Sequence, residues 1–209
     1  MTEVSAVLFP ENIVCEVLAA SDGASGRVVS PLGVIRRGAD LMSKVFWSTF
    51  TYANVLNSRK VTFNVTSDAL VFFDCLFERS EQTARLKPLD GFLFLPGSEA
   101  WVGAVLESEI PDSLLPRSEL VFKPVAGAVG ERTPRCYTRA NAALIEMLVH
   151  YTRIEPYLKE GRAAEARRLY ELMVHYSELI GRVAQDSAYS GRAKELMEKA
   201  RSLLEVGKP

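Results

Sequence analysis

The first two thirds of the chain alternate short apolar runs with clusters of turn residues, a pattern typical of β-strands. It predicts six strands, at residues 12–20, 27–37, 41–47, 60–68, 101–110 and 119–131. One short helix is predicted at 51–59, and residues 89–100 are expected to form a loop-rich excursion. Residues 69–77, "ALVFFDCLF", are too uniformly apolar to distinguish a strand from a helix. Six strands with mostly short connections favour a barrel or a sandwich over a βαβ sheet.

The last third changes to the period of amphipathic helices. Three helices are predicted, at 138–155, 162–185 and 190–206, and the first is expected to stop at Pro156. Each carries one apolar stripe, which in the second helix comprises Ala166, Leu169, Tyr170, Met173, Tyr176 and Ile180. Such helices must pack on their neighbours, so we expect an antiparallel helical unit. The predicted protein is therefore of the α+β class, with a barrel domain at 1–133 and a helical domain at 134–209.

Composition and charge exclude several functional classes. The chain has 209 residues and a formal net charge of -1, without the clustered basic excess of a nucleic-acid surface. No apolar run approaches the length that crosses a membrane, and the N-terminus lacks the features of a secretory signal. Cys15, Cys75 and Cys136 are odd in number and far apart, which suits a reducing cytoplasm and forms no metal-binding pattern. We expect a cytoplasmic protein that binds neither nucleic acid nor membrane.

Motifs for self-sufficient catalysis are missing. The sequence has no dinucleotide-binding glycine fingerprint, no P-loop and no serine in a nucleophile-elbow context. His150 and His175 are the only histidines, too few with these dispersed cysteines for a tight zinc site. Any demanding chemistry must then come from a bound cofactor, and no catalytic side chain is predicted.

The stretch "STFTYAN", residues 48–54, is one candidate cofactor site. It places Ser48, Thr49 and Thr51 at the start of the predicted short helix, with Asn54 one turn later. A helix start exposes unpaired N–H groups and a partial positive charge, so these side chains can complete a phosphate cradle. The alternative is that Ser48 or Thr49 is an ordinary N-cap.

The stretch "VSPLGVI", residues 29–35, is the other candidate. Pro31 removes a donor from the strand ladder, and Gly33 allows a close approach of the backbone. A flat ring can lie against such an interrupted strand and take hydrogen bonds from its backbone. The alternative is a β-bulge or the end of a strand.

Together, the two stretches resemble the FMN-binding split β-barrel superfamily, which includes flavin reductase-like and pyridoxamine phosphate oxidase-like proteins. Flavin reductases of that group have a Ser-Pro segment, a Thr-x-x-Asn helix start and a strand ending in Val-Asn. Thr51 and Asn54 fall on the helix start, and Asn64 with Val65 on the strand end. Phe50 departs from the pattern, because those reductases often have an acidic residue there.

A closer resemblance is to the largely archaeal family called domain of unknown function 447. Its motifs are Glu-x-Ile-Val, Pro-x-Gly-Val, Thr-Tyr-x-Asn and Arg-Ala-Asn-x-x-x-Ile-Glu, matched here at 11–14, 31–34, 51–54 and 139–146. The resemblance implies a dimeric split barrel with FMN near the subunit interface, and it implies no known reaction.

These inferences define the expected site. The cofactor is FMN, contacted by Ser30, Pro31, Leu32, Gly33, Val34, Ser48, Thr49, Phe50, Thr51 and Asn54. Trp47 or Phe50 either contacts the ring or belongs to the core. As an enzyme, the protein would use FMN to accept hydride from a reduced nicotinamide nucleotide and pass it to an unknown acceptor. The alternatives are another cofactor, deazaflavin or haem, and a carrier or interaction module without turnover.

One face of the first long helix carries Arg139, Glu146, His150 and Arg153. This strip has three interpretations. It is a solvated row of charges, or it closes over the site with His150 as a proton donor, or Arg139 and Glu146 tie the helices to the barrel. We favour the tie. His175 is expected to be a partly buried packing residue.

Overall fold

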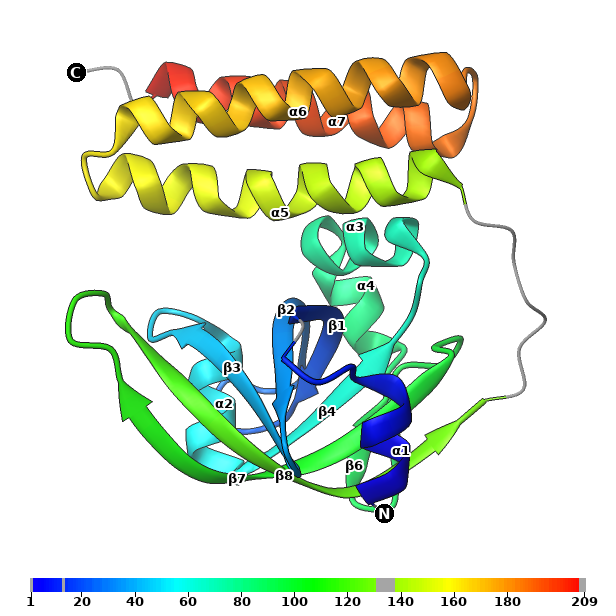
Figure 1. The fold of residues 1–209 in the computed structure, drawn as a ribbon, viewed down its shortest axis with the longest axis vertical. Coiled ribbons are helices and arrows are strands. Elements are labelled where there is room, and N and C mark those ends of the chain that lie inside the picture. Colours follow the sequence, from blue (N-terminus) through cyan, green and yellow to red (C-terminus); the bar gives the residue numbers. More distant parts are fainter. Residues whose placement is uncertain (1, 13, 131–137, 207–209) are drawn as a thin grey trace. The chain divides into compact units, whose positions relative to one another are not determined.

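The computed structural model describes residues 2–12, 14–130 and 138–206. The chain forms two compact units, each with its own internal contacts (Figure 1). The barrel unit comprises Met1–Ser67 and Asp74–Thr133, and the helical unit comprises Asp68–Phe73 and Pro134–Pro209. The predicted domain boundary at 133/134 lies outside the described residues, so the domain limits stay a prediction. Ile13 and Cys136 also lie outside the described residues. None of the helices in the described ranges is long and apolar enough to span a bilayer. The cytoplasmic location also stays a prediction.

The predicted barrel is confirmed. Six antiparallel strands close on themselves in the order β1-β2-β3-β8-β7-β4. Their bounds are β1 Val14–Ser21, β2 Val28–Arg37, β3 Asp40–Phe46, β4 Lys60–Val65, β7 Ala100–Pro111 and β8 Arg117–Val129. The protein is therefore of the α+β class, a split barrel followed by three C-terminal helices.

Alternation along β4 explains how this strand is covered on both faces. Val61 and Phe63 point into the barrel core, where the Phe63 ring meets that of Phe122 edge-on at 5.4 Å. The other face carries Thr62 and Asn64, which are equally buried. Thr62 Oγ1 and Asn64 Oδ1 accept hydrogen bonds from the backbone N–H groups of Leu93 and Leu95, at 3.2 and 2.8 Å. These polar side chains thus hold the segment around β6 (Phe92–Phe94) against the barrel.

The segment around β6 is more regular than predicted. Residues 89–100 were expected to be loop-rich, but β5 (Lys87–Leu89) and β6 pair as a hairpin. Asp90 and Gly91 form its two-residue turn, with φ of 50° and 79°. Asp-Gly is a strong signal for such a turn, because both residues must adopt positive φ.

Four short helices precede or connect the barrel strands along the chain. α2 (Phe50–Ser58) is the predicted helix, and α3 (Ala69–Phe77) resolves the ambiguous apolar stretch as a helix. α1 (Thr2–Leu8) and α4 (Arg79–Ala84) were not predicted.

The helical unit contains α5 (Arg139–Lys159), α6 (Ala163–Val183) and α7 (Ala188–Val206). The expected stop at Pro156 is wrong, since α5 runs on to Lys159 with Pro156 inside it. The predicted stripe of α6 is confirmed: Ala166, Met173 and Ile180 are fully buried, and Leu169, Tyr170 and Tyr176 are half-buried. His175, expected to be partly buried, is exposed beside Tyr176, with ring centroids 5.7 Å apart.

Candidate functional site

The two candidate stretches meet through a hydrogen bond between side chains. Ser30 Oγ on β2 and Thr51 Oγ1 in the first turn of α2 lie 2.8 Å apart. Thr51 is almost completely buried and Ser30 is half-buried. The strand of one candidate and the helix start of the other therefore form one place on the barrel unit, as the sequence predicted.

The start of α2 answers the question of the N-cap. Thr49 is the cap: its hydroxyl accepts from the N–H of Tyr52 at 3.2 Å and donates to the carbonyl of Phe46 at 2.8 Å. Ser48 is exposed and precedes the cap. The capping interpretation is thus correct for Thr49, whereas Thr51 lies one residue inside the helix and bonds Ser30. The first N–H groups of the helix still have no acceptor within it.

Asn54 does not point its amide at the helix start. The side chain is fully buried against the turn between β1 and β2. Its Oδ1 accepts from the N–H of Ser25 at 2.9 Å, and its Nδ2 donates to the carbonyl of Gly26 at 2.6 Å and to Ser21 Oγ at 3.4 Å. Asn54 thus fastens α2 to this turn, and its polar atoms are already used within the protein.

The other candidate stretch lies on an incompletely paired strand. β1 pairs with β2 from Val28 to Ile35, whereas β3 pairs with β2 only at Ile35–Arg37. The edge of β2 from Val28 to Val34 that faces away from β1 therefore has no strand partner in the described part of the chain. Such an edge leaves backbone groups available to a ligand.

Residues 31–34 play different roles along this edge. Pro31 and Leu32 are half-buried, whereas the Val34 side chain is fully buried in the barrel core. Gly33 lies opposite Glu16 of β1, and an added Cβ would approach the side chain of Val14 to 3.2 Å. The close approach predicted for Gly33 is therefore to β1. Its carbonyl accepts from Ser43 Oγ at 2.8 Å.

Two aromatic side chains flank the helix start and are not core residues. Trp47 is 45% exposed and Phe50 is 55% exposed. Trp47 is nevertheless fixed, because its Nε1 donates to Ser118 Oγ at 2.8 Å. Ser118 Oγ in turn donates to Glu109 Oε1 at 2.6 Å, and so does the hydroxyl of Tyr52. The indole and the first turn of α2 are thus anchored to one carboxylate.

This network also sets the protonation of its members. Hydrogen bonds from Ser118 and Tyr52 hold the pKa of Glu109 below its ordinary value. The bond to Glu109 raises the pKa of Tyr52. At neutral pH the carboxylate is therefore charged and both hydroxyls are protonated. Sequence reasoning missed Glu109 and Ser118, because the network joins residues of β3, α2, β7 and β8 that are far apart in the chain.

The predicted strip on α5 is exposed at Arg139, Glu146 and Arg153. His150 is half-buried, burial lowers its pKa, and its ring lies 5.9 Å from that of Tyr176 on α6. A neutral imidazole packed in this way is a poor candidate for a proton donor at neutral pH. The predicted tie of Arg139 and Glu146 to the barrel stays a prediction.

Two family models match the chain, one over the barrel strands and one over the C-terminal helices. A family model described as the N-terminal domain of a protein of unknown function (DUF447) matches residues 15–130. A second model, described as protein of unknown function (DUF447), matches residues 138–199. The chain belongs to the DUF447 family. The split in these matches falls between the strands of the barrel and α5.

Solved structures share the fold at low sequence identity. The FMN-bound DUF447 protein MM1853 from Methanosarcina mazei matches with a TM-score of 0.74 and 21% identity, over 94% of this chain and 99% of that one. A candidate flavin reductase with a split barrel domain from Shewanella frigidimarina matches with a TM-score of 0.51 and 14% identity, over 65% of this chain and 77% of that one. The match to the M. mazei protein thus includes the C-terminal helices of this chain. The match to the S. frigidimarina protein covers a smaller part of this chain.

Proposed function

We propose that the barrel unit binds FMN where the first turn of α2 meets the open edge of β2. The observation that carries this proposal is the Ser30–Thr51 hydroxyl pair, which joins a helix start to a strand edge that pairs with no other strand among the described residues. The FMN-bound structure of the M. mazei DUF447 protein supports it. Bound FMN would supply the capacity to accept and donate hydride.

The phosphate end of FMN suits the start of α2. A phosphate dianion is favoured by the helix dipole and by backbone N–H groups that lack intrahelical acceptors. The hydroxyls of Thr51 and Ser30 can each accept or donate a hydrogen bond. One hydroxyl can therefore donate to the phosphate while it accepts a hydrogen bond from the other. Thr49 contributes by capping the helix, and Ser48 lies exposed beside that cap.

The ring end suits the edge of β2 and the two exposed aromatic side chains. Pro31 and Leu32 offer half-buried apolar surface, and the unpaired strand edge offers backbone groups to the polar rim of the ring. Trp47 presents a fixed indole next to the helix start. Val34 and Asn54 lie within the protein interior, so we assign them to supporting the site and not to contacting the cofactor.

We further propose an oxidoreductase, in which reduced nicotinamide nucleotide is the electron donor. The residues at the site supply positioning: hydroxyls and N–H groups bind the phosphate, and apolar side chains limit the access of water to the ring. No titratable side chain is assigned to proton transfer, because Glu109 is held charged by two donors.

We also propose a homodimer with the cofactor near the subunit interface. Trp47, Phe50, Ile110 and Leu114 leave large apolar side chains exposed on the barrel unit. A second copy would cover such surface and shield the ring, and two-fold pairing is the commonest arrangement. Sedimentation that shows a monomer at micromolar concentration with FMN still bound would contradict the dimer.

The test of FMN binding uses Thr51→Val, which removes the hydroxyl and keeps the shape. If Thr51 bonds the phosphate, the affinity for FMN falls by about 1.5–3 kcal/mol, the value of a charge-assisted hydrogen bond. The affinity for riboflavin, which lacks the phosphate, should barely change. Thr152→Val, at a threonine of α5 in the helical unit, is the matched control.

Fluorescence titration with both ligands decides the outcome. Equal weakening of FMN and riboflavin, or no weakening of either, contradicts a phosphate contact by Thr51. Absence of FMN binding up to about millimolar concentration contradicts the proposed cofactor itself. The visible spectrum of freshly purified protein then distinguishes deazaflavin or haem, and anaerobic reduction of bound FMN by NADH distinguishes an oxidoreductase from a carrier.

A further inference from the structure

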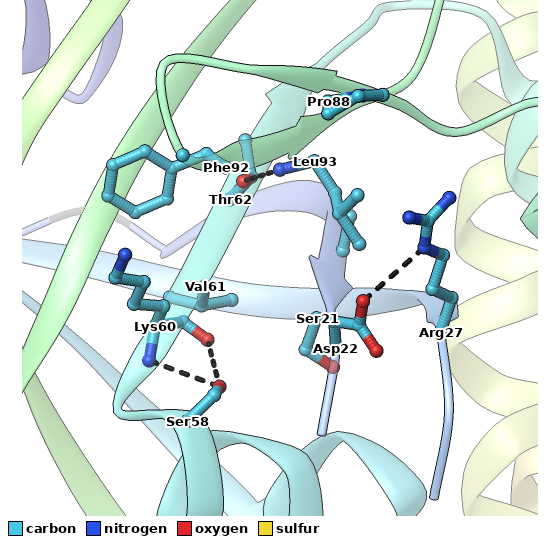
Figure 2. A pocket seen from close by; sticks show the side chains of 12 residues that line it. Ser21, Asp22, Arg27, Ser58, Lys60, Val61, Thr62, Pro88, Phe92 and Leu93 are labelled. Atoms are coloured by element: carbon cyan, nitrogen blue, oxygen red, sulfur yellow. Dashed lines mark hydrogen bonds and ion pairs between the residues drawn. The ribbon is translucent and has the colours of Figure 1, made fainter.

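The barrel unit has a second hollow at the opposite end of α2. It is an open depression of about 260 Å³ between the C-terminal end of α2, the adjoining ends of β1 and β4, and the β5–β6 hairpin (Figure 2). α2 is nine residues long, so its two ends lie roughly 12 Å apart. Neither Ser30 nor Thr51 lines the hollow.

The floor of the hollow is apolar. Ala20 and Leu93 line it and are buried. Its polar side chains already have partners: Thr62 Oγ1 accepts from the N–H of Leu93, and Ser21 Oγ accepts from the amide of Asn54. A ligand there meets hydrocarbon below and does not have to satisfy buried polar atoms.

The rim carries an aromatic ring and an excess of positive charge. Arg27 and Asp22 form an ion pair, with Nε and Oδ2 3.3 Å apart, which leaves little net charge on that side. Lys60 stands on the other side, its Nζ 5.5 Å from the centre of the Phe92 ring (Figure 2). Within the described ranges Lys60 has no carboxylate partner, so its ammonium is the uncompensated charge of the rim.

We propose that this hollow binds a small aromatic carboxylate. A single ring would rest on the apolar floor beside Phe92, and its carboxylate would pair with Lys60. The volume is below the range typical of drug-sized ligands, which favours one ring over a nucleotide. The rim has one net positive charge, from Lys60 and Arg27 against Asp22, which suits a monoanion.

The test is a titration of the full-length, isotope-labelled protein with benzoate, followed by ¹H–¹⁵N NMR. FMN is present at saturation in one series and absent in another, so that the result does not depend on the proposed function. The expected dissociation constant is on the order of 1 mM, as befits a ligand of this size. The backbone signals of Lys60, Gly91 and Phe92 should move. Benzamide, which lacks the charge, and inorganic phosphate, which lacks the ring, should bind at least about fivefold more weakly.

Variants assign the contacts. Lys60→Met removes the charge and keeps most of the stem, and it should weaken benzoate binding by about three- to fivefold. Phe92→Leu should weaken it as well. Lys44→Met, at another exposed strand lysine of the barrel, is the control and should leave the affinity unchanged.

Three results would overturn the proposal. The first is no benzoate binding at about 20 mM, well above the expected dissociation constant. The second is undiminished binding by Lys60→Met, or shifts confined to residues near Ser30 and Thr51. The third is phosphate binding as tightly as benzoate, which would make the hollow a simple anion site.

Discussion

Asn54 provides a sharp test of how α2 is fixed to the barrel. Asn54→Ala removes an amide that makes two short hydrogen bonds, to the N–H of Ser25 and the carbonyl of Gly26, and one long bond to Ser21 Oγ. Ser25 and Gly26 are exposed, so water can replace the lost partners there. Ser21 is buried and loses its donor.

The expected cost follows from these contacts. Each short bond contributes roughly 1 kcal/mol net, and the truncated side chain leaves a small void next to Gly23. We therefore expect Asn54→Ala to lower the free energy of unfolding of the barrel unit by about 2–3 kcal/mol. Asn57→Ala, at an exposed position of the same helix, should change it by less than about 0.5 kcal/mol.

Urea denaturation followed by tryptophan fluorescence measures this effect in the right unit. The chain has two tryptophans, Trp47 and Trp101, and both lie in the barrel unit. A change for Asn54→Ala no larger than for Asn57→Ala would refute the argument. Unchanged stability together with selective loss of FMN over riboflavin would show that the amide serves the phosphate and not the turn.

Three further predictions concern other parts of the chain. The lowered pKa of Glu109 means that its hydrogen bonds stabilise the fold above the ordinary pKa of 4.5 and that this contribution is lost as the pH falls. Glu109→Gln should flatten the acid limb of stability against pH, and an unchanged limb would contradict the network. Burial raises the pKa of Cys75 to about 12, so iodoacetamide at about pH 8 should leave it unmodified in the folded protein, as mass spectrometry can check. Pro156→Ala should restore a hydrogen bond to the Thr152 carbonyl within α5 and raise the free energy of unfolding of the helical unit by about 1–3 kcal/mol, measured by circular dichroism. A loss of stability would show that Pro156 is favoured there by packing.

The sequence predicts the fold well where one physical signal dominates. Alternating apolar residues define the barrel strands, and a single apolar stripe defines each long helix, because burial of one face requires that period. The stop at Pro156 failed because a proline late in a helix costs one hydrogen bond, and the packing of α5 along its length outweighs that cost. The β5–β6 hairpin was missed although Asp90-Gly91 carries its turn signal, because three-residue strands show almost no alternation.

The candidate site is predicted only in part, since sequence distance hides which side chains meet. The sequence assigns Ser30 and Thr51 to one site, but the hydrogen bond between them is seen only in the structure. The sequence does not predict that Trp47 is anchored through Ser118 to Glu109. This contact depends on how far the β7–β8 hairpin extends beside the start of α2.

The polar residues of the motifs divide by what their side chains bond. Asn54 and Asn64 are fully buried, and each holds backbone of another segment, the β1–β2 turn or the segment around β6. A buried side-chain amide needs hydrogen-bond partners. When those partners are backbone groups of another segment, one residue fixes the position of that segment. The demands of the fold are therefore enough to account for both asparagines. Ser30 and Thr51 differ, because their hydrogen bond joins two side chains and does not hold the backbone of another segment. That pair is where we propose that the motif meets the cofactor, so Thr51→Val tests binding whereas Asn54→Ala tests folding.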